Sequence, residues 1–316
     1  MTSPLLSWPG AVAADPPDVG VAAHYGDPYA EQRSLAAGSA LVDLSHRPVL
    51  RVAGPDRLPW LHSLLTQHLT SLTPGQWTQA LVLSPQGRVE HHLTLVDDGA
   101  QLLAHVEPGT LGGLIDFLQR MRFMLRVEVD DVTGDYAVVH QAGADRFVPR
   151  ATLPDLDAPL AGIGAYEALR VAARQPRLGL DTDHKTIPHE MGWLGSAVHL
   201  DKGCYRGQET VARVYNLGRP PRRLVLLHLD GSDSELPATG DPVLLEDRAV
   251  GRVGTAVRHH ELGPVALAVV KRQVPDDAVL VAGSVPASID PAPAFEAPVS
   301  PAREAAAARE GLLRRR

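Results

Sequence analysis

Hydrophobic and polar residues follow two different periods in the first two thirds of the chain. Leucines at helical spacing predict helices over residues 57–65 and 110–120, the first with Asp56 as its N-cap, and 28–37 and 166–173 also have helical character. Alternating or short apolar segments between turn residues predict strands at 40–44, 49–52, 76–83, 88–96, 102–106, 125–129 and 136–140. Because strands and helices interleave, we predict an α+β fold.

The pattern changes after residue 217, where short strands recur at regular spacing. Segments 223–229, 242–246, 249–258 and 264–270 are apolar and separated by Gly or Pro turns, which is typical of a small barrel or sandwich. Residues 1–20 predict a mobile or surface arm, 143–162 a connector, and 284–316 a Pro- and Ala-rich disordered tail. Its last three residues are arginines, too few to predict a membrane or nucleic-acid anchor.

Composition and charge exclude several classes of function. A net charge of -7 and an aromatic fraction of 4% argue against direct nucleic-acid binding. A single cysteine rules out an internal disulfide, a Cys-x-x-Cys redox pair and a multi-cysteine metal site within one chain. Neither a signal peptide nor a membrane-spanning segment is evident, so we expect a soluble, cytoplasmic protein.

That one cysteine, Cys204, is the strongest candidate for chemistry. It lies between Gly203 and Gly207, which permit sharp turns, and between Lys202 and Arg206, which would favour a thiolate. An accessible reactive thiol and a small residue in a tight turn are both open interpretations. No pattern assigns a histidine as its general base, so a nucleophilic hydrolase is the weaker variant.

Other polar motifs are less specific. The pairs His91-His92 and His259-His260 would point to opposite faces of a strand, so neither pair chelates one ion and we predict no metal site. Glu209 and Arg213 are four residues apart and would pair on a helix, where they could orient the Cys204 loop. Phosphate-binding glycine loops are absent from the sequence.

The segment from 202 to 209, Lys-Gly-Cys-Tyr-Arg-Gly-Gln-Glu, resembles the Lys-Gly-Cys-Tyr/Phe-x-Gly-Gln-Glu signature of the YgfZ family. These are folate-binding relatives of the glycine-cleavage aminomethyltransferase, or T-protein, that support iron–sulfur enzymes, including tRNA-modifying ones. Further similarity lies in segments 43–47, 52–56, 61–69, 83–89, 169–171, 188–190 and 222–224. The arm before residue 20 and the tail after 284 are not covered.

The resemblance implies a folate-binding domain in two segments, 21–100 and 161–217, a ferredoxin-like insertion at 101–160 and a C-terminal barrel at 218–283. It implies tetrahydrofolate or a derivative as cofactor, transient iron–sulfur partner proteins, no nucleic acid or membrane partner, and a monomer. Cys204 would be the reactive residue. Candidates for the folate site and its loop are Lys202, Gly203, Tyr205, Arg206, Gly207, Gln208, Glu209, Arg213, Arg170, Glu190 and Arg88.

Two departures from T-protein separate the possible functions. His91-His92 stand where T-protein has a pair of aspartates, and Ala172 stands where it has a second acid. Carboxylates hold a cationic amine more readily than histidine does, so aminomethyl transfer is disfavoured. The sequence therefore favours a YgfZ-like folate-binding protein that acts through Cys204. A folate-dependent C1 transferase and a scaffold with a structural cysteine are the alternatives.

Overall fold

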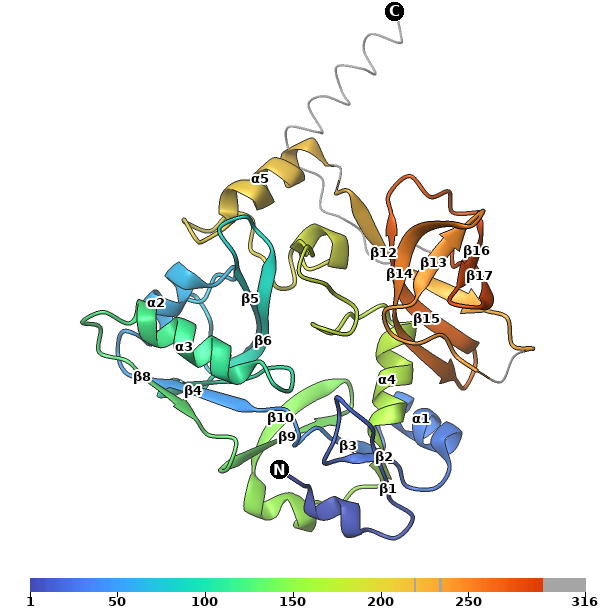
Figure 1. Ribbon diagram of the computed structural model, residues 1–316. Coiled ribbons are helices and arrows are strands. Elements are labelled where there is room, and N and C mark those ends of the chain that lie inside the picture. Colours follow the sequence, from blue (N-terminus) through green and yellow to red (C-terminus); the bar gives the residue numbers. More distant parts are fainter. Residues whose placement is uncertain (219, 233–234, 292–316) are drawn as a thin grey trace, which may run out of the picture.

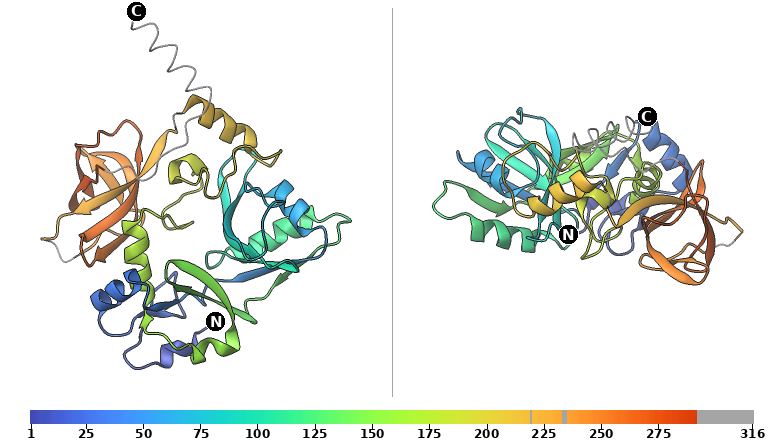
Figure 2. Two further views of the ribbon diagram at one scale, coloured as in Figure 1. Left: turned by 180° about the vertical axis from the view of Figure 1, so that it is seen from behind. Right: turned by 90° about the horizontal axis from the view of Figure 1, so that it is seen from above.

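The computed structural model describes residues 1–218, 220–232 and 235–291. Three units lie around a common centre, which the irregular segment between residues 174 and 200 crosses (Figure 1). The two views of Figure 2 show the units side by side in one layer. The chain combines helices with mostly antiparallel strands, so the predicted α+β class is confirmed. Among the described residues, no helix has the length and apolar composition needed to cross a bilayer.

The first unit is a five-stranded antiparallel sheet packed against two helices. Its elements are β4 (Val49–Ala53), α2 (Arg57–Leu64), β5 (Trp77–Leu83), β6 (Val89–Asp97), β7 (Gln101–His105), α3 (Leu111–Met121) and β8 (Glu128–Asp131). The strands pair in the order β5-β6-β7-β4-β8. Without the edge strand β5, this is the βαββαβ arrangement of a ferredoxin-like fold.

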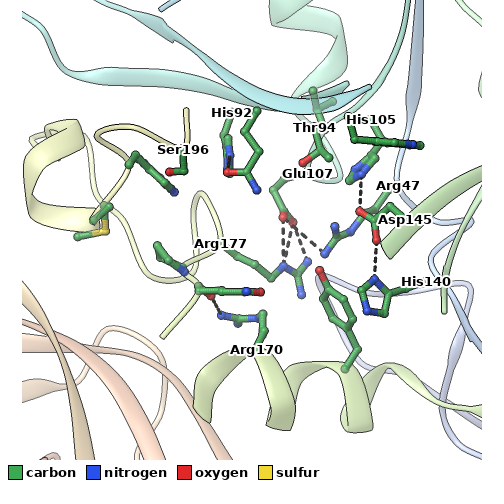
Figure 3. Close-up of a pocket in the computed structure, with 18 of the residues that line it drawn as sticks. Arg47, His92, Thr94, His105, Glu107, His140, Asp145, Arg170, Arg177 and Ser196 are labelled. Atoms are coloured by element: carbon green, nitrogen blue, oxygen red, sulfur yellow. Dashed lines mark hydrogen bonds and ion pairs between the residues drawn. The ribbon is translucent and has the colours of Figure 1, made fainter. Parts of the chain in front are cut away.

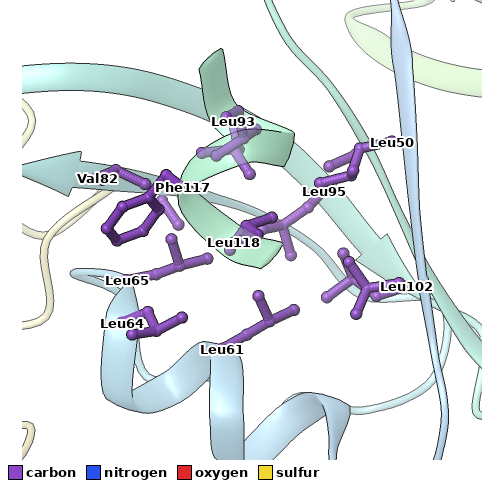
Figure 4. Packing of buried hydrophobic residues seen from close by; sticks show 14 of the residues in the cluster. Leu50, Leu61, Leu64, Leu65, Val82, Leu93, Leu95, Leu102, Phe117 and Leu118 are labelled. Carbon is purple, nitrogen blue, oxygen red and sulfur yellow. The ribbon is translucent and has the colours of Figure 1, made fainter. Parts of the chain in front are cut away.

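Leucines spaced three or four residues apart form the core of this unit. Leu61 and Leu65 come from the α2 region and Leu118 from α3, and they meet Leu93 and Leu95 of β6 (Figure 4). Each fully buried leucine contributes roughly 1.5–3 kcal/mol. The predicted cap of α2 is wrong, because the Asp56 side chain makes no cap hydrogen bond and instead binds Arg126, with 2.9 Å between Asp56 Oδ1 and Arg126 Nη2.

The second unit surrounds a four-stranded sheet of order β10-β9-β3-β11. The sheet strands are β3 (Leu41–Asp43), β9 (Tyr136–Gln141), β10 (Ala144–Pro149) and β11 (Leu160–Ala161). Around them lie η1 (Pro4–Ser7), β1 (Val12–Ala13), β2 (Ala22–His24), α1 (Pro28–Ala36), η2 (Arg150–Asp155) and α4 (Ile163–Ala172). Helix α1 packs against α4, and β11 pairs in parallel with β3.

Sheet pairing places the domain boundaries differently from the sequence prediction. The predicted boundary at residue 100 separates β6 from β7, which are hydrogen-bonded neighbours. The ferredoxin-like unit therefore spans 49–131 rather than 101–160. It is inserted between β3 and β9, which pair directly, with Asp43 opposite Val139.

Two segments predicted to be irregular belong to the second unit. The predicted connector 143–162 contains β10, η2 and β11. The predicted N-terminal arm packs into the fold, since Leu5 and Asp18 are 2% and 7% exposed. Neither segment has a clear hydrophobic period, so contacts with the rest of the unit give these segments their defined structure.

The third unit is a closed six-stranded barrel, as predicted. Its strands are β12 (Arg222–Leu229), β13 (Pro242–Leu245), β14 (Arg248–His259), β15 (Gly263–Lys271), β16 (Val279–Ala282) and β17 (Val285–Ile289). The predicted tail begins too early, because β17 pairs with both β12 and β16 and closes the barrel. The remainder of that prediction, 292–316, lies outside the described residues. Two further elements, η3 (Pro188–Met191) and α5 (Gln208–Leu217), lie between α4 and the barrel.

Candidate functional site

A cavity of about 470 Å³ lies at the centre, where strands of the ferredoxin-like unit face helix α4 and the β9–β10 turn (Figure 3). A second cavity of about 540 Å³ adjoins it and shares His140, Gly143, Tyr166, Arg170 and Gln175 with it. Each volume is within the usual range for small-molecule sites. Aromatic side chains of the first cavity are Trp77, Tyr166 and Trp193.

Arg170, a predicted site residue, lines both cavities and connects α4 to the barrel. Its Nη1 donates to Asp181 Oδ2 at 2.8 Å, and its Nη2 donates to Thr255 Oγ1 of β14 at 2.6 Å. A further ion pair joins it to Glu167. The donors of Arg170 are therefore engaged by protein partners. Its role is to fix the shape of the site and not to bind a ligand directly.

Arg177 is the second fully engaged cation of the cavity. It donates to Glu107 Oε2 and to Asp18 Oδ1, both at 2.7 Å, and to Glu167 Oε1 at 2.8 Å. Burial opposes the charge of Glu107, but Arg47 and Arg177 outweigh it and lower the pKa of Glu107 to about 2. Burial also opposes the charge of Asp18, but hydrogen bonds from His46 and Arg177 hold its pKa well below the usual range.

Asp145, in the β10 strand, bridges two histidines on the cavity wall. His105 Nε2 lies 2.9 Å from Asp145 Oδ2, and His140 Nδ1 lies 2.6 Å from Oδ1. Burial lowers the pKa of His105, although the hydrogen bond and charge of Asp145 act in the opposite direction. Burial disfavours the charge of Asp145 too, yet the two histidine hydrogen bonds hold its pKa far below the usual range.

His92 and His91 point to opposite sides of β6, as strand geometry predicts. His92 lines the cavity, with Nε2 3.2 Å from Gln79 Oε1 and its ring centroid 4.8 Å from that of Trp193. Burial lowers the pKa of His92 to about 4, so the ring is neutral at pH 7. His91 faces α3, where its Cε1 lies 3.5 Å from the position of a Cβ on Gly113.

Arg47 differs from Arg170 and Arg177, whose donors are engaged. It is only 4% exposed, and its Nε and Nη2 have no hydrogen-bond partner in the described part of the chain. Its guanidinium lies 5.2 Å from the centre of the Tyr166 ring, and Nη2 is 3.8 Å from Glu107 Oε1. A buried arginine with free donors is costly, so these atoms are candidates for ligand contact.

Cys204 is an exposed free thiol. It is not among the described residues that line the central cavity. The prediction that both flanking cations serve the thiol is wrong. Lys202 is buried, and its Nζ donates to the backbone carbonyls of His62, Leu65 and Gln67 around the end of α2. Burial lowers the pKa of Lys202 to about 8, which leaves the amine protonated at pH 7.

Arg206 is likewise engaged away from the thiol. Its Nη1 lies 3.2 Å from Glu90 Oε2, and its guanidinium lies 5.5 Å from the centre of the Phe117 ring. Tyr205, next to it, belongs to the core between α5 and the barrel, and burial raises its pKa to about 12. The loop is thus anchored by its neighbours and presents Cys204 and Gly203 to solvent.

Gly207 shapes the loop by backbone geometry. It has φ 82° at the N-cap of α5, and a Cβ there would lie 2.5 Å from the carbonyl oxygen of Ser84. Gly87, at the tip of the β5–β6 hairpin, has φ 77°, and a Cβ there would lie 2.7 Å from the Cβ of Thr210. Both glycines are required for the hairpin and the helix to touch.

The remaining predicted residues do not line the cavity. Glu190 is buried and accepts from Arg222 Nε at 2.8 Å and Nη2 at 2.7 Å, so it attaches the barrel to the central segment. Glu209, Arg213 and Arg88 are exposed, and Gln208 is half-buried. In the described residues Glu209 and Arg213 form no ion pair with each other, so the predicted helical pair is wrong.

Several cavity residues were not predicted from the sequence: Arg47, Glu107, Asp145, His105, His140 and Arg177. A usable signal existed for Arg47 and His105, because each follows or ends a predicted strand, where polar side chains often serve a site. Asp145 and Arg177 fall in segments without periodicity, and only tertiary contacts bring them to the cavity.

Comparisons with known proteins agree with the fold and the sequence motif. No family model matches the chain. It is 29% identical over 311 residues to the tRNA-modifying protein YgfZ of Edwardsiella ictaluri, covering 80% of this chain and 92% of that protein. It is 27% identical over 240 residues to a mitochondrial homolog of the iron–sulfur cluster assembly factor IBA57 in Mycosarcoma maydis, covering 63% and 59%.

A chloroplastic protein of Arabidopsis thaliana is 24% identical over 271 residues, covering 68% of this chain and 61% of that protein. The chain thus spans about three fifths of the length of this relative and of the IBA57 homolog. The crystal structure of the glycine cleavage system aminomethyltransferase T of Bartonella henselae has a TM-score of 0.75 at 16% identity, covering 93% of this chain and 97% of that one. The fold is that of the T-proteins, and the sequence is similar to YgfZ and to an iron–sulfur cluster assembly factor.

Proposed function

We propose that this protein binds a reduced folate in the central cavities and supports the assembly, repair or protection of iron–sulfur enzymes through Cys204. It would act as a monomer in the cytoplasm, with transient protein partners, among them enzymes that modify tRNA. Relatives named as a tRNA-modifying protein, an iron–sulfur cluster assembly factor and aminomethyltransferases support this combination. The sequence similarity to YgfZ favours this function over aminomethyl transfer and over a purely structural role.

The pair of adjoining cavities is the observation that carries the folate part. Folate has a flat ring and a long acidic tail, and a cavity of about 470 Å³ adjoins another of about 540 Å³ with which it shares lining residues. Trp77, Tyr166 and Trp193 offer aromatic surface to a flat ring, and Gln79 and Thr94 offer polar contacts. A ligand with one ring and one extended arm suits that shape.

The thiol part rests on the exposure of Cys204. The loop is fixed by contacts of Lys202, Tyr205 and Gly207 with the rest of the protein. The thiol is therefore exposed at a defined position on the surface. A partner protein would reach it without entering the cavity. Folate and thiol would then act at separate surfaces, and the cations beside Cys204 serve the loop.

The alternative, aminomethyl transfer to folate, needs a free carboxylate to hold the amine. The carboxylates on the cavity wall are engaged, Glu107 by Arg177 and Asp145 by two histidines. His92, at the position of the T-protein aspartates, is neutral. We therefore expect no methylenetetrahydrofolate from an aminomethylated donor protein, and clear turnover would favour the alternative.

Two measurements test the proposal. Calorimetry with 5-formyltetrahydrofolate is expected to give saturable 1:1 binding, and no binding would contradict the ligand. In a bacterial strain lacking its own YgfZ, the wild-type protein is expected to restore iron–sulfur enzyme activity and Cys204→Ala is expected to fail. Arg88→Ala, which alters an exposed residue outside the cavity, is the matched control. Full rescue by Cys204→Ala would favour a scaffold role.

A further inference from the structure

Among the described arginines of the first cavity, Arg47 has two buried nitrogens without a hydrogen-bond partner, whereas Arg174 has one, its Nε, and is more exposed and bound to Asp290. Arg170 and Arg177 each donate to at least three protein oxygens. Arg47 is as deeply buried, at 4% exposure, yet its Nε and Nη2 have no partner among the described residues. Buried donors are nearly always satisfied, so this exception calls for an acceptor that enters the cavity.

The charge around Arg47 indicates what kind of acceptor fits. Glu107, at 3.8 Å, and Asp145 both act on the guanidinium, and Arg177 is the cation that opposes them. Arg177 also binds Asp18 and Glu167, so protein carboxylates already offset the charges of Arg47 and Arg177. A further carboxylate from a ligand would add unbalanced negative charge at a buried site, which is costly. A neutral oxygen, such as a ring carbonyl, would satisfy the donors without that cost.

The shape around Arg47 is also suited to a flat ring. Its guanidinium lies 5.2 Å from the centre of the Tyr166 ring, and Tyr166 lines both cavities. Arg47 itself lines only the first cavity, together with Trp77 and Trp193. An acidic arm would then extend away from Arg47, past the shared lining residues and toward the second cavity.

From these observations we infer that Arg47 is the residue that anchors the ligand's ring, donating to a neutral carbonyl-type oxygen of a flat heteroaromatic group. This rests on the proposed folate function for the identity of the ring, a pterin. It assigns the pterin end to the first cavity, which Arg47 lines, and the glutamate end to the second. Arg47 would thus set both the orientation of the ligand and the preference for an oxygen acceptor.

The test uses Arg47→Met, which keeps an unbranched apolar chain in place of the arginine stem and removes its donors, and Arg88→Met as the control outside the cavity. Calorimetry would compare 5-formyltetrahydrofolate, a reduced pterin without the tail, and p-aminobenzoylglutamate, which is the tail without the pterin. For Arg47→Met we expect the affinity for the first two to fall about 10- to 100-fold. Affinity for the tail fragment should change less than about twofold, and Arg88→Met should match the wild type.

Thermal unfolding without ligand separates a binding role from a structural one. Because Arg47→Met removes unsatisfied buried donors, its midpoint should equal or exceed that of the wild type. A lowered midpoint with unchanged affinities would show that the arginine is structural and would overturn the inference. If Arg47→Met is too unstable to titrate, Arg47→Lys takes its place. Lysine keeps the charge but lacks the planar set of guanidinium donors, so this variant is expected to lose pterin affinity as well.

The remaining outcomes are also decisive. Selective loss of the tail fragment would reverse the assigned orientation and overturn the inference. Wild-type affinity of Arg47→Met for 5-formyltetrahydrofolate would overturn it while leaving the proposed function intact. Failure of the wild-type protein to bind any of the three compounds would contradict the proposed function and the inference together.

Discussion

Gly207 and Gly87 pack backbone against backbone, and a Cβ added to Gly207 would lie 2.9 Å from the Cα of Gly87. One glycine belongs to the Cys204 loop and the other to the tip of the β5–β6 hairpin. The hairpin also carries His92 into the cavity. The thiol loop and the cavity wall are therefore supported by the same contact, although they face different surfaces.

Gly207→Ala should destabilise the protein by at least about 2 kcal/mol, because it adds a clash with Ser84 to a left-handed backbone. Gly203→Ala is the matched control, since nothing lies within 4 Å of its Cβ position, and it should cost less than about 0.5 kcal/mol. Urea unfolding measures both. Equal stability of the two variants would contradict the role given to the contact.

Lys202→Met should lower the free energy of unfolding by about 2–3 kcal/mol, because it leaves the carbonyls at the end of α2 without their donor. Lys185→Met, at an exposed lysine, should have little effect. If the two variants unfold at the same denaturant concentration, the Lys202 contacts contribute nothing to stability.

Glu190→Gln should cost about 3 kcal/mol by breaking a buried ion pair with Arg222, yet leave folate affinity unchanged. Glu90→Gln breaks the exposed pair with Arg206 and should cost less than about 1 kcal/mol. Unfolding and calorimetry on both variants test this, and weakened folate binding by Glu190→Gln would restore Glu190 as a site residue.

His189 predicts a pH dependence of stability. Burial lowers its pKa in the folded protein to about 4, from an ordinary value of 6.5. Between these pH values the unfolded chain binds the proton and the folded protein does not, so stability falls as the pH is lowered through this window. The loss approaches about 3 kcal/mol.

The variant His189→Phe should therefore lose less stability than the wild type between pH 6.5 and pH 4. Denaturant unfolding at several pH values gives the two slopes, and only the slopes are compared, because the substitution also changes packing. Mutation of the exposed His184 serves as the control. Parallel slopes for wild type and His189→Phe would contradict burial of a neutral imidazole.

Cys204 should be alkylated by iodoacetamide in the folded protein at a rate within about threefold of free cysteine, since it is exposed and both neighbouring cations have other partners. Arg206→Gln should leave that rate unchanged. A tenfold faster reaction of the wild type, lost in Arg206→Gln, would revive the idea of a cation-activated thiol.

The elements with a strong hydrophobic period were predicted well. The leucines of α2 and α3, the β5–β6 hairpin and four barrel strands lie close to their predicted positions, because each buries one regular face. The short strands β10, β11, β16 and β17 were missed. They are ordered by pairing with distant strands, and pairing leaves little trace in a local pattern.

The sequence by itself determined the α+β class, the barrel and the resemblance carried by the Lys202–Glu209 motif, because these depend on local periodicity and on residue types at fixed spacing. Only the tertiary structure decided what the motif residues do. Lys202 binds a helix end, Gly207 allows a backbone contact, and Cys204 remains exposed. The cavity, with Arg47 from one turn and Arg177 from another segment 130 residues away, exists only because long-range packing brings them together.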